Sequence, residues 1–141
     1  MMQAKIKPVK RRSNCPVTYT LDIIGDRWAV LIIRDIIFFG KSSFGEFAKS
    51  QEGIATNILT DRLKRLEEQN ILTKTTNQAN QKKFVYSLTE KGLDLLPIIV
   101  EMILYSEKHD PETVVTKSQL KEIKANKEKF ILELQKKHRC A

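Results

Sequence analysis

The segment from Thr56 to Gln69 constrains the fold more than any other part of the chain, because it combines one apolar and one polar face at helical spacing. At 100° per residue its apolar side chains share one sector of a helix: Ile58, Leu59, Leu63 and Leu66. The roughly opposite sector is polar and holds Asn57, Thr60, Asp61, Lys64 and Glu68. Asn70 stands where a left-handed residue can end a helix. The pattern predicts a helix with one buried face and one face in solvent.

Two short strands are predicted directly after this helix, over 71–76 and 83–88. In the second strand Phe84, Tyr86 and Leu88 alternate onto one face. The six residues 77–82 between the strands are polar except for Ala79, as is typical of a hairpin tip. The expected fold class is therefore α+β, mainly helical, with one two-stranded hairpin.

Three helices are predicted before residue 56. Asn14 is expected to cap the first, since asparagine is a good cap and Pro16 is tolerated in a first turn. This helix should end at Gly25. A short helix after the serines at 42 and 43 should end near Ser50.

The helix between these two, 27–39, is apolar on nearly every side and should be capped by Asp26. Its β-branched residues favour a strand on propensity alone. However, its 13 residues exceed the usual length of a strand, and Gly40 stands where a C-cap glycine would. We therefore expect a buried helix.

One long helix is predicted from Thr89 to His109, with a bend near Pro97. It has too many apolar residues for a helix with one solvent-exposed face, which suggests that it forms a subunit interface. The competing interpretation is a helix buried in the centre of the domain. The residues expected at a homodimer interface are Leu95, Ile98, Ile99, Met102 and Ile103.

Charge divides the 141-residue chain into three parts. Residues 1–14 carry five basic and no acidic side chains and are expected to form an arm that is either solvated or in contact with DNA. Residues 112–141 carry eight basic and four acidic side chains and are predicted to form a C-terminal amphipathic helix. The net charge of +8 favours a polyanionic partner, either nucleic acid or an acidic membrane surface. Residues 15–111 are close to neutral, so DNA contacts there depend on local patches.

Composition also excludes several classes. Two cysteines 125 positions apart are too few and too scattered for a disulfide scaffold or a zinc site. No apolar run reaches the ~18 residues of a membrane span, and no export signal is visible. We expect a cytoplasmic protein with no cofactor, no metal and no membrane partner.

The order of predicted elements is that of a winged helix-turn-helix, and five strings strengthen this interpretation. They are CPV at 15–17, LDIIGDRW at 21–28, FGEF at 44–47, LTDRL at 59–63 and YSLTEKG at 86–92. Together they resemble the signature of HxlR-type transcription regulators over residues 15–105, and the domain is expected to span 15–111. Asn70, the Asn- and Gln-rich wing tip and Tyr105 depart from the family pattern; residues 112–141 lie outside it.

The resemblance implies that the helix of residues 56–69 enters the major groove of double-stranded DNA, where base edges present distinct donors and acceptors. The expected contact residues are Thr56, Asn57, Thr60, Asp61 and Lys64. Asn57 can pair bidentately with adenine, and Lys64 can approach guanine. Asp61 fits less well, because its charge would face the DNA. The alternative is an ordinary solvated helix face.

Five further side chains are candidates for DNA backbone contacts: Arg27, Ser43, Arg62, Lys82 and Lys83. Lys82 and Lys83 at the hairpin end would contact phosphates or the minor groove, or else lie in a solvated turn. Arg27 and Ser43 lie near helix starts, where exposed amides favour phosphate. Arg62 projects near the apolar sector and either extends to a phosphate or forms an internal ion pair.

Cys15 is the candidate redox residue, because it resembles the N-terminal cysteine that some HxlR-type regulators use as a sensor. Its position at a helix start near Lys10, Arg11 and Arg12 favours the thiolate. Oxidation could join subunits, for example through Cys15 of one and Cys140 of another. The alternative is a small, buried and inert side chain. An oxidant or a small molecule is thus the expected kind of effector.

The sequence bears on three classes of function. The preferred one is a homodimeric transcriptional regulator that binds an inverted-repeat operator. The second is a winged-helix protein-interaction module that does not recognise specific DNA. An enzyme is disfavoured because His109 and His138 are isolated and no phosphate loop or Ser-His-Asp arrangement is visible.

Overall fold

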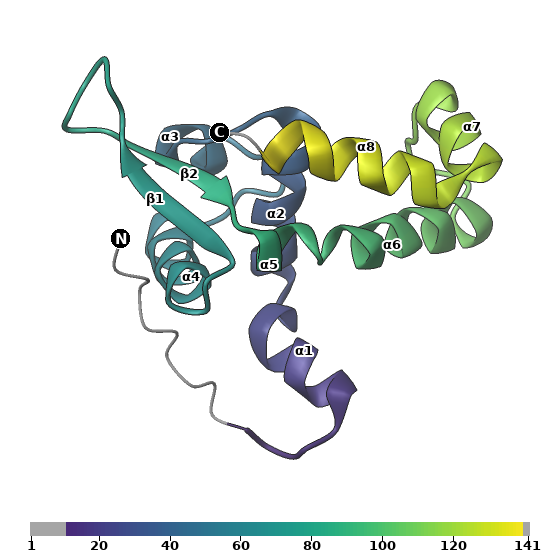
Figure 1. Ribbon diagram of the computed structural model, residues 1–141, viewed down its shortest axis with the longest axis horizontal. Helices are drawn as coiled ribbons and strands as arrows, with labels where there is room; N and C mark the ends of the chain where they lie inside the picture. Colours follow the sequence, from purple (N-terminus) through teal and green to yellow (C-terminus); the bar gives the residue numbers. More distant parts are fainter. Residues whose placement is uncertain (1–10, 140–141) are drawn as a thin grey trace. The chain divides into compact units, whose positions relative to one another are not determined.

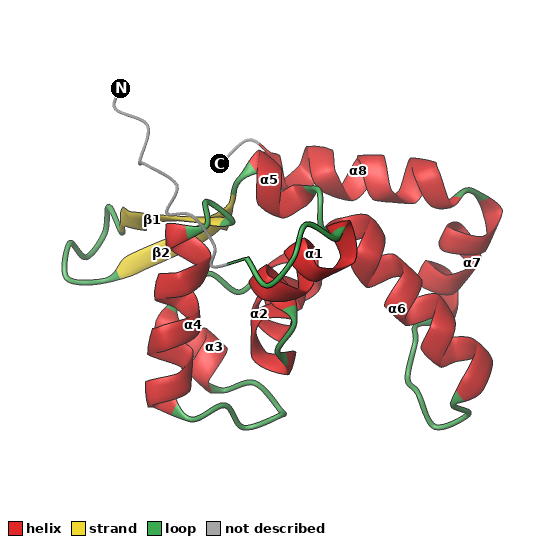
Figure 2. Ribbon diagram, turned by 90° about the horizontal axis from the view of Figure 1, so that it is seen from below, coloured by secondary structure: helices red, strands yellow, loops and turns green. Residues whose placement is uncertain are grey.

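The computed structural model describes residues 11–139, which form eight helices and one two-stranded antiparallel sheet (Figures 1 and 2). The helices are α1 (Pro16–Ile24), α2 (Arg27–Phe39), α3 (Phe44–Ala48), α4 (Thr56–Glu68), α5 (Glu90–Leu93), α6 (Leu96–His109), α7 (Lys117–Ala125) and α8 (Lys127–Arg139). The strands are β1 (Leu72–Thr76) and β2 (Phe84–Leu88). The α+β, mainly helical class expected from the sequence is confirmed. The chain divides into two compact units, the first ending at Gly92 and the second beginning at Leu93.

Helix α2 confirms the preference for a buried helix over a strand. The carboxylate of Asp26 caps it by accepting hydrogen bonds from the backbone amides of Trp28 and Ala29, at 2.8 and 2.9 Å. Gly40 ends it with a φ of 64°, a left-handed conformation that glycine adopts without a steric penalty. Ile32 and Ile33 are among the side chains it buries. Tertiary burial has therefore overridden the strand propensity of its β-branched residues.

The connection between α3 and α4 forms the turn of the helix-turn-helix. Helix α3 begins at Phe44 behind a capping box, in which Ser43 accepts from the amide of Glu46 and the Glu46 carboxylate accepts from the amide of Ser43. In the turn, Gly53 has a φ of 71°. Helix α4 follows, and its apolar sector packs inwards with three buried leucines: Leu59, Leu63 and Leu66.

Asn70 ends this region with a φ of 60°, as its position after α4 predicts. Strands β1 and β2 pair in the register Leu72 with Leu88 and Thr76 with Phe84. The amide of Tyr86 donates a 2.7 Å hydrogen bond to the carbonyl of Ser42, which ties β2 to the segment before α3. The wing is thereby anchored beside the helix-turn-helix at its base.

The single helix predicted over 89–109 is wrong. The structure contains two helices, α5 and α6, separated at Asp94 and Leu95, and Pro97 lies in the first turn of α6. Proline is favoured there because amides of a first turn have no intrahelical acceptor. The proline thus helps to start a second helix instead of bending a continuous one.

The second unit also differs from expectation, because α7 and α8 replace the single C-terminal helix predicted for 112–141. Asn126 lies between them in an extended conformation with φ −160° and ψ 92°. Its side-chain oxygen accepts a 3.1 Å hydrogen bond from the amide of Lys129, so it caps α8. Asparagine favours this capping position over a helix interior, which explains the break.

Three features hold the second unit together. Ile123, Phe130 and Ile131 are buried, and the side-chain amide of Gln135 donates a 3.0 Å hydrogen bond to the carbonyl of Leu93. Lys127 also forms an ion pair with Glu101 of α6. Within residues 11–139, no helix has the length and apolar character that crossing a bilayer requires.

Candidate nucleic-acid interface

The polar face of α4 is presented to solvent, because the buried leucines on the opposite face pack against the rest of the first unit. Thr56, Asn57, Thr60 and Lys64 are all exposed. The hydroxyl of Thr60 donates to the carbonyl of Thr56 at 2.9 Å, which leaves its methyl group and oxygen lone pairs for contacts. Four of the five predicted base-contacting residues therefore lie together on one accessible helix face.

Asp61, the fifth, is 53% exposed but is not a free negative charge. It forms an ion pair with Arg62 and lies 3.8 Å from the guanidinium of Arg65, one turn further along the helix. These cations offset the repulsion that an isolated carboxylate would exert on DNA. The structure therefore gives Asp61 an intramolecular role that the sequence pattern alone did not show.

Arg62 forms an internal ion pair, one of the two alternatives predicted for it. Its Nε lies 3.0 Å from Oδ2 of Asp26, in charge contact without hydrogen-bond alignment. The other carboxylate oxygen of Asp26 caps α2. Asp26 thus connects the start of α2 to the middle of α4, and this pair helps to position the exposed face of α4.

The wing tip is shaped by the side chains of two asparagines. Asn77 accepts from the amide of Ala79 at 2.8 Å, and Asn80 accepts from the amide of Lys82 at 3.1 Å. Such Asx turns stabilise tight turns without glycine or proline. Lys82 and Lys83 are exposed beside this tip, where phosphate contacts are sterically possible.

The two candidates at helix starts differ. Arg27 is exposed in the first turn of α2. Ser43 is occupied by its capping box: the Glu46 carboxylate accepts from the Ser43 amide at 3.2 Å and from its hydroxyl at 3.0 Å. These bonds, and others from Ser42, lower the pKa of Glu46. An internal carboxylate already fills the place of a phosphate, which counts against a DNA contact at Ser43.

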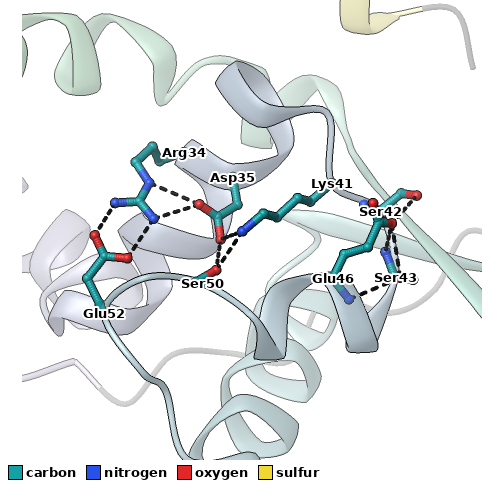
Figure 3. Close-up of polar contacts among 8 residues, drawn as sticks. All are labelled: Arg34, Asp35, Lys41, Ser42, Ser43, Glu46, Ser50 and Glu52. Carbon is teal, nitrogen blue, oxygen red and sulfur yellow. Dashed lines mark hydrogen bonds and ion pairs between the residues drawn. The ribbon is translucent and has the colours of Figure 1, made fainter. Parts of the chain in front are cut away.

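Sequence inspection missed a polar network that supports the helix-turn-helix (Figure 3). Its centre is Asp35 of α2, which is only 2% exposed. Asp35 accepts from Arg34 at 2.7 Å, from Lys41 at 3.4 Å and from the hydroxyl of Ser50. The signal in the sequence was a charged pair, Arg34 and Asp35, inside an apolar run.

Arg34 extends this network to the turn before α4. Its guanidinium donates to both carboxylate oxygens of Glu52, at 2.6 and 2.9 Å. This bidentate contact raises the pKa of Arg34 and lowers the pKa of Glu52 to about 2. The end of α2 and the turn between α3 and α4 are therefore joined by charge as well as by packing.

Cys15 is exposed, so the burial assumed in the alternative interpretation of this residue is wrong. It occupies the N-cap position of α1, and Asn14 is not the cap. The nearby amides of Thr18 and Val17 and the Thr18 hydroxyl, in the first turn of α1, favour the thiolate and lower the pKa of Cys15. Cys140, its suggested disulfide partner, lies outside the described residues.

The predicted interface residues of 89–109 have different surroundings. Ile99 is buried, whereas Met102 is 48% exposed. Leu95, Ile98 and Ile103 are partly exposed. In the first unit, Val17 and Leu21 also present apolar side chains to solvent, one turn apart on α1. Among residues 11–139, no cluster of His, Cys, Asp or Glu could hold a metal ion.

With this geometry established, the chain was compared with known proteins. The family model described as HxlR-like helix-turn-helix matches residues 23–114. The chain belongs to the HxlR-like helix-turn-helix family. YdeP of Bacillus subtilis, named an HTH-type transcriptional regulator, is 38% identical over 68% of this chain and 74% of its own length.

Two solved structures agree with this assignment. The redox regulator HypR in its reduced form has a TM-score of 0.60 and 34% identity, covering 69% of this chain and 95% of that one. The reduced transcriptional regulator YodB from B. subtilis has a TM-score of 0.55 and 27% identity, covering 72% and 100%. The predicted winged helix-turn-helix fold is confirmed, and this HxlR-like protein is a DNA-binding transcription regulator.

Proposed function

We propose that this HxlR-like protein is a homodimeric repressor or activator that recognises an inverted-repeat operator with α4 in successive major grooves. The observation that carries the proposal is the exposed face of α4, where Asn57, Thr60 and Lys64 lie opposite the buried leucines. An α-helix fits the major groove, and amide and ammonium groups match adenine and guanine edges there. The wing lysines Lys82 and Lys83, with Arg27, supply backbone contacts that add affinity but little sequence preference.

Dimerisation follows from apolar surface that one chain leaves in water. Met102 and Tyr105 on α6 are 48% and 69% exposed, and Leu95, Ile98 and Ile103 are partly covered. Exposed apolar patches of this kind commonly mark protein interfaces. A two-fold dimer would place two copies of α4 about 34 Å apart, one turn of DNA. Ile99, already buried, would support this surface from within.

We further propose that Cys15 senses oxidants, because it is exposed and its pKa is lowered. Two thiols, Cys15 of one subunit and Cys15 or Cys140 of the other, would lose two electrons and two protons to a quinone. The products are a disulfide and the hydroquinone. HypR and YodB have been solved in oxidised and quinone-bound forms, respectively. Such a crosslink would alter how the two α4 helices are spaced.

A gel shift with a random duplex and with genomic fragments retained by the protein tests the proposal. The expected result is weak binding to the random duplex and strong, footprinted binding to an inverted repeat. Protection of one half-site alone would contradict the dimeric arrangement. Failure to bind any duplex would favour a protein-interaction module instead.

A further inference from the structure

A cavity of about 200 Å³ lies between α4, α3 and the base of the wing, within the first unit. It is lined by Phe44, Thr60, Leu63, Lys64, Glu67, Lys74 and Tyr86. Its walls are well supported: Lys74 and Tyr86 are paired across the sheet, and Tyr86 packs edge-on against Phe47 with ring centroids 6.1 Å apart. The cavity thus lies between elements of the helix-turn-helix and the wing and is partly open to solvent.

The lining has an apolar floor and a charged rim. Leu63 and Tyr86 are buried, while Phe44, 36% exposed, presents part of its ring to solvent. Lys64 and Lys74 line the cavity with two positively charged side chains, and Glu67 with one negatively charged side chain. The ammonium of Lys74 also lies over the ring of Phe84, 4.0 Å from its centroid. The excess of positive charge favours an anion, and the aromatic floor favours a flat ring.

We propose that this cavity binds a small aromatic carboxylate, with its ring against Phe44 and Tyr86 and its carboxylate between Lys64 and Lys74. The volume suits a single substituted ring, since pockets for drug-sized ligands begin at about 300 Å³. Burial, and secondarily the charge of Glu67, raise the pKa of Tyr86, so this side chain adds no negative charge to the cavity.

The site has a regulatory consequence that rests on the proposed function. Thr60 and Lys64 line the cavity and also belong to the face of α4 proposed to contact bases. A carboxylate paired with Lys64 competes with guanine for the same ammonium group. Ligand and operator should therefore bind in competition, so the ligand acts as an inducer that releases DNA.

Benzoate is the probe, and benzamide is its uncharged counterpart of nearly the same shape. Benzoate should shift the amide resonances of the cavity residues in a protein NMR titration carried to about 10 mM, the affinity range of small fragments. Benzamide should bind at least about fivefold more weakly. Lys74→Gln should weaken benzoate binding about five- to tenfold. Lys82→Gln, which removes an exposed wing lysine outside the cavity, is the matched control and should leave it unchanged.

Phe44→Ala removes the exposed ring and gives a second variant that tests the floor of the cavity. It should weaken benzoate binding without moving the Tyr86 anchor to the carbonyl of Ser42. Shifts confined to residues outside the cavity, equal binding of benzamide, or unchanged affinity in Lys74→Gln would each overturn the proposal.

Competition with DNA is measured separately. Because DNA binding is salt-dependent, the control sample contains sodium chloride in place of benzoate at the same ionic strength. Saturating benzoate should raise the apparent dissociation constant of the operator at least about fivefold relative to chloride. Benzoate binding by a protein that binds no DNA would refute the proposed function and leave the cavity site intact. DNA binding without benzoate binding would refute the site alone.

Discussion

The ion pair between Asp26 and Arg62 should stabilise the protein and position α4, and Asp26→Asn tests this with little other change. Asparagine caps helices as well as aspartate does, so the amides of Trp28 and Ala29 keep their acceptor. The variant removes only the negative charge that lies 3.0 Å from Nε of Arg62. The two side chains are 31% and 22% exposed, between the surface and buried extremes.

Exposed ion pairs contribute about 0.2–1 kcal/mol, and breaking a buried pair costs about 3–5 kcal/mol. Because this contact is partly exposed and not aligned as a hydrogen bond, we expect Asp26→Asn to lower the free energy of unfolding by about 1 kcal/mol. Asp26→Ala should cost about 1 kcal/mol more, since it also removes the cap of α2.

Urea unfolding at one fixed protein concentration measures these changes, because dimer stability depends on concentration. A double-mutant cycle with Arg62→Met should give a coupling energy of about 0.5–1 kcal/mol. A coupling energy near zero, or equal stability of Asp26→Asn and the unaltered protein, would refute the role of the pair. Arg62→Met should also weaken DNA binding, because it leaves the negative charge of Asp61 without this partner. The double variant with Asp61→Asn should regain part of the lost DNA affinity.

The wing, the sensor, the turn and the subunit contact each give a further test. Lys82→Ala combined with Lys83→Ala should weaken binding to all duplexes alike and reduce the salt slope by about one for each lost phosphate contact, measured by fluorescence anisotropy. Cys15→Ser should keep its DNA affinity after quinone treatment and form no crosslinked dimer on a non-reducing gel. The ion pair between Glu52 and Arg34 stabilises the fold above pH 4.5, and this stabilisation is lost as the pH falls towards about 2. The free energy of unfolding of Glu52→Gln should therefore fall less over that pH range than that of the unaltered protein. Met102→Glu should shift sedimentation at micromolar concentration towards the monomer.

Much of the first unit was predictable because its signals are local. The end of α2 is encoded by Gly40 and the end of α4 by Asn70, and both adopt the left-handed conformation. The spacing of the leucines along α4 was enough to predict which face of this helix is buried. These features depend on neighbours within about one helical turn, which periodicity and capping rules describe well.

Features that depend on distant residues were not predictable in the same way. The contact of Arg62 with Asp26 spans two helices, so the helical pattern left two alternatives open. The break at Asn126 required its side chain to cap α8 in preference to continuing a helix. The alternative of a buried Cys15 rested on residue type, whereas its N-cap position leaves the side chain in solvent.

Base recognition by α4 is tested most directly by the ratio of two dissociation constants at one salt concentration, one for a random duplex and one for the selected operator. We expect a ratio of at least about 1,000 for the unaltered protein. Asn57→Ala should lose about 1–3 kcal/mol at the operator and little on random DNA, which reduces the ratio. The control variant that combines Lys82→Ala and Lys83→Ala should lower the affinities for the operator and for the random duplex alike and leave their ratio unchanged. A ratio near one for the unaltered protein, or an unchanged ratio in Asn57→Ala, would contradict base recognition by α4.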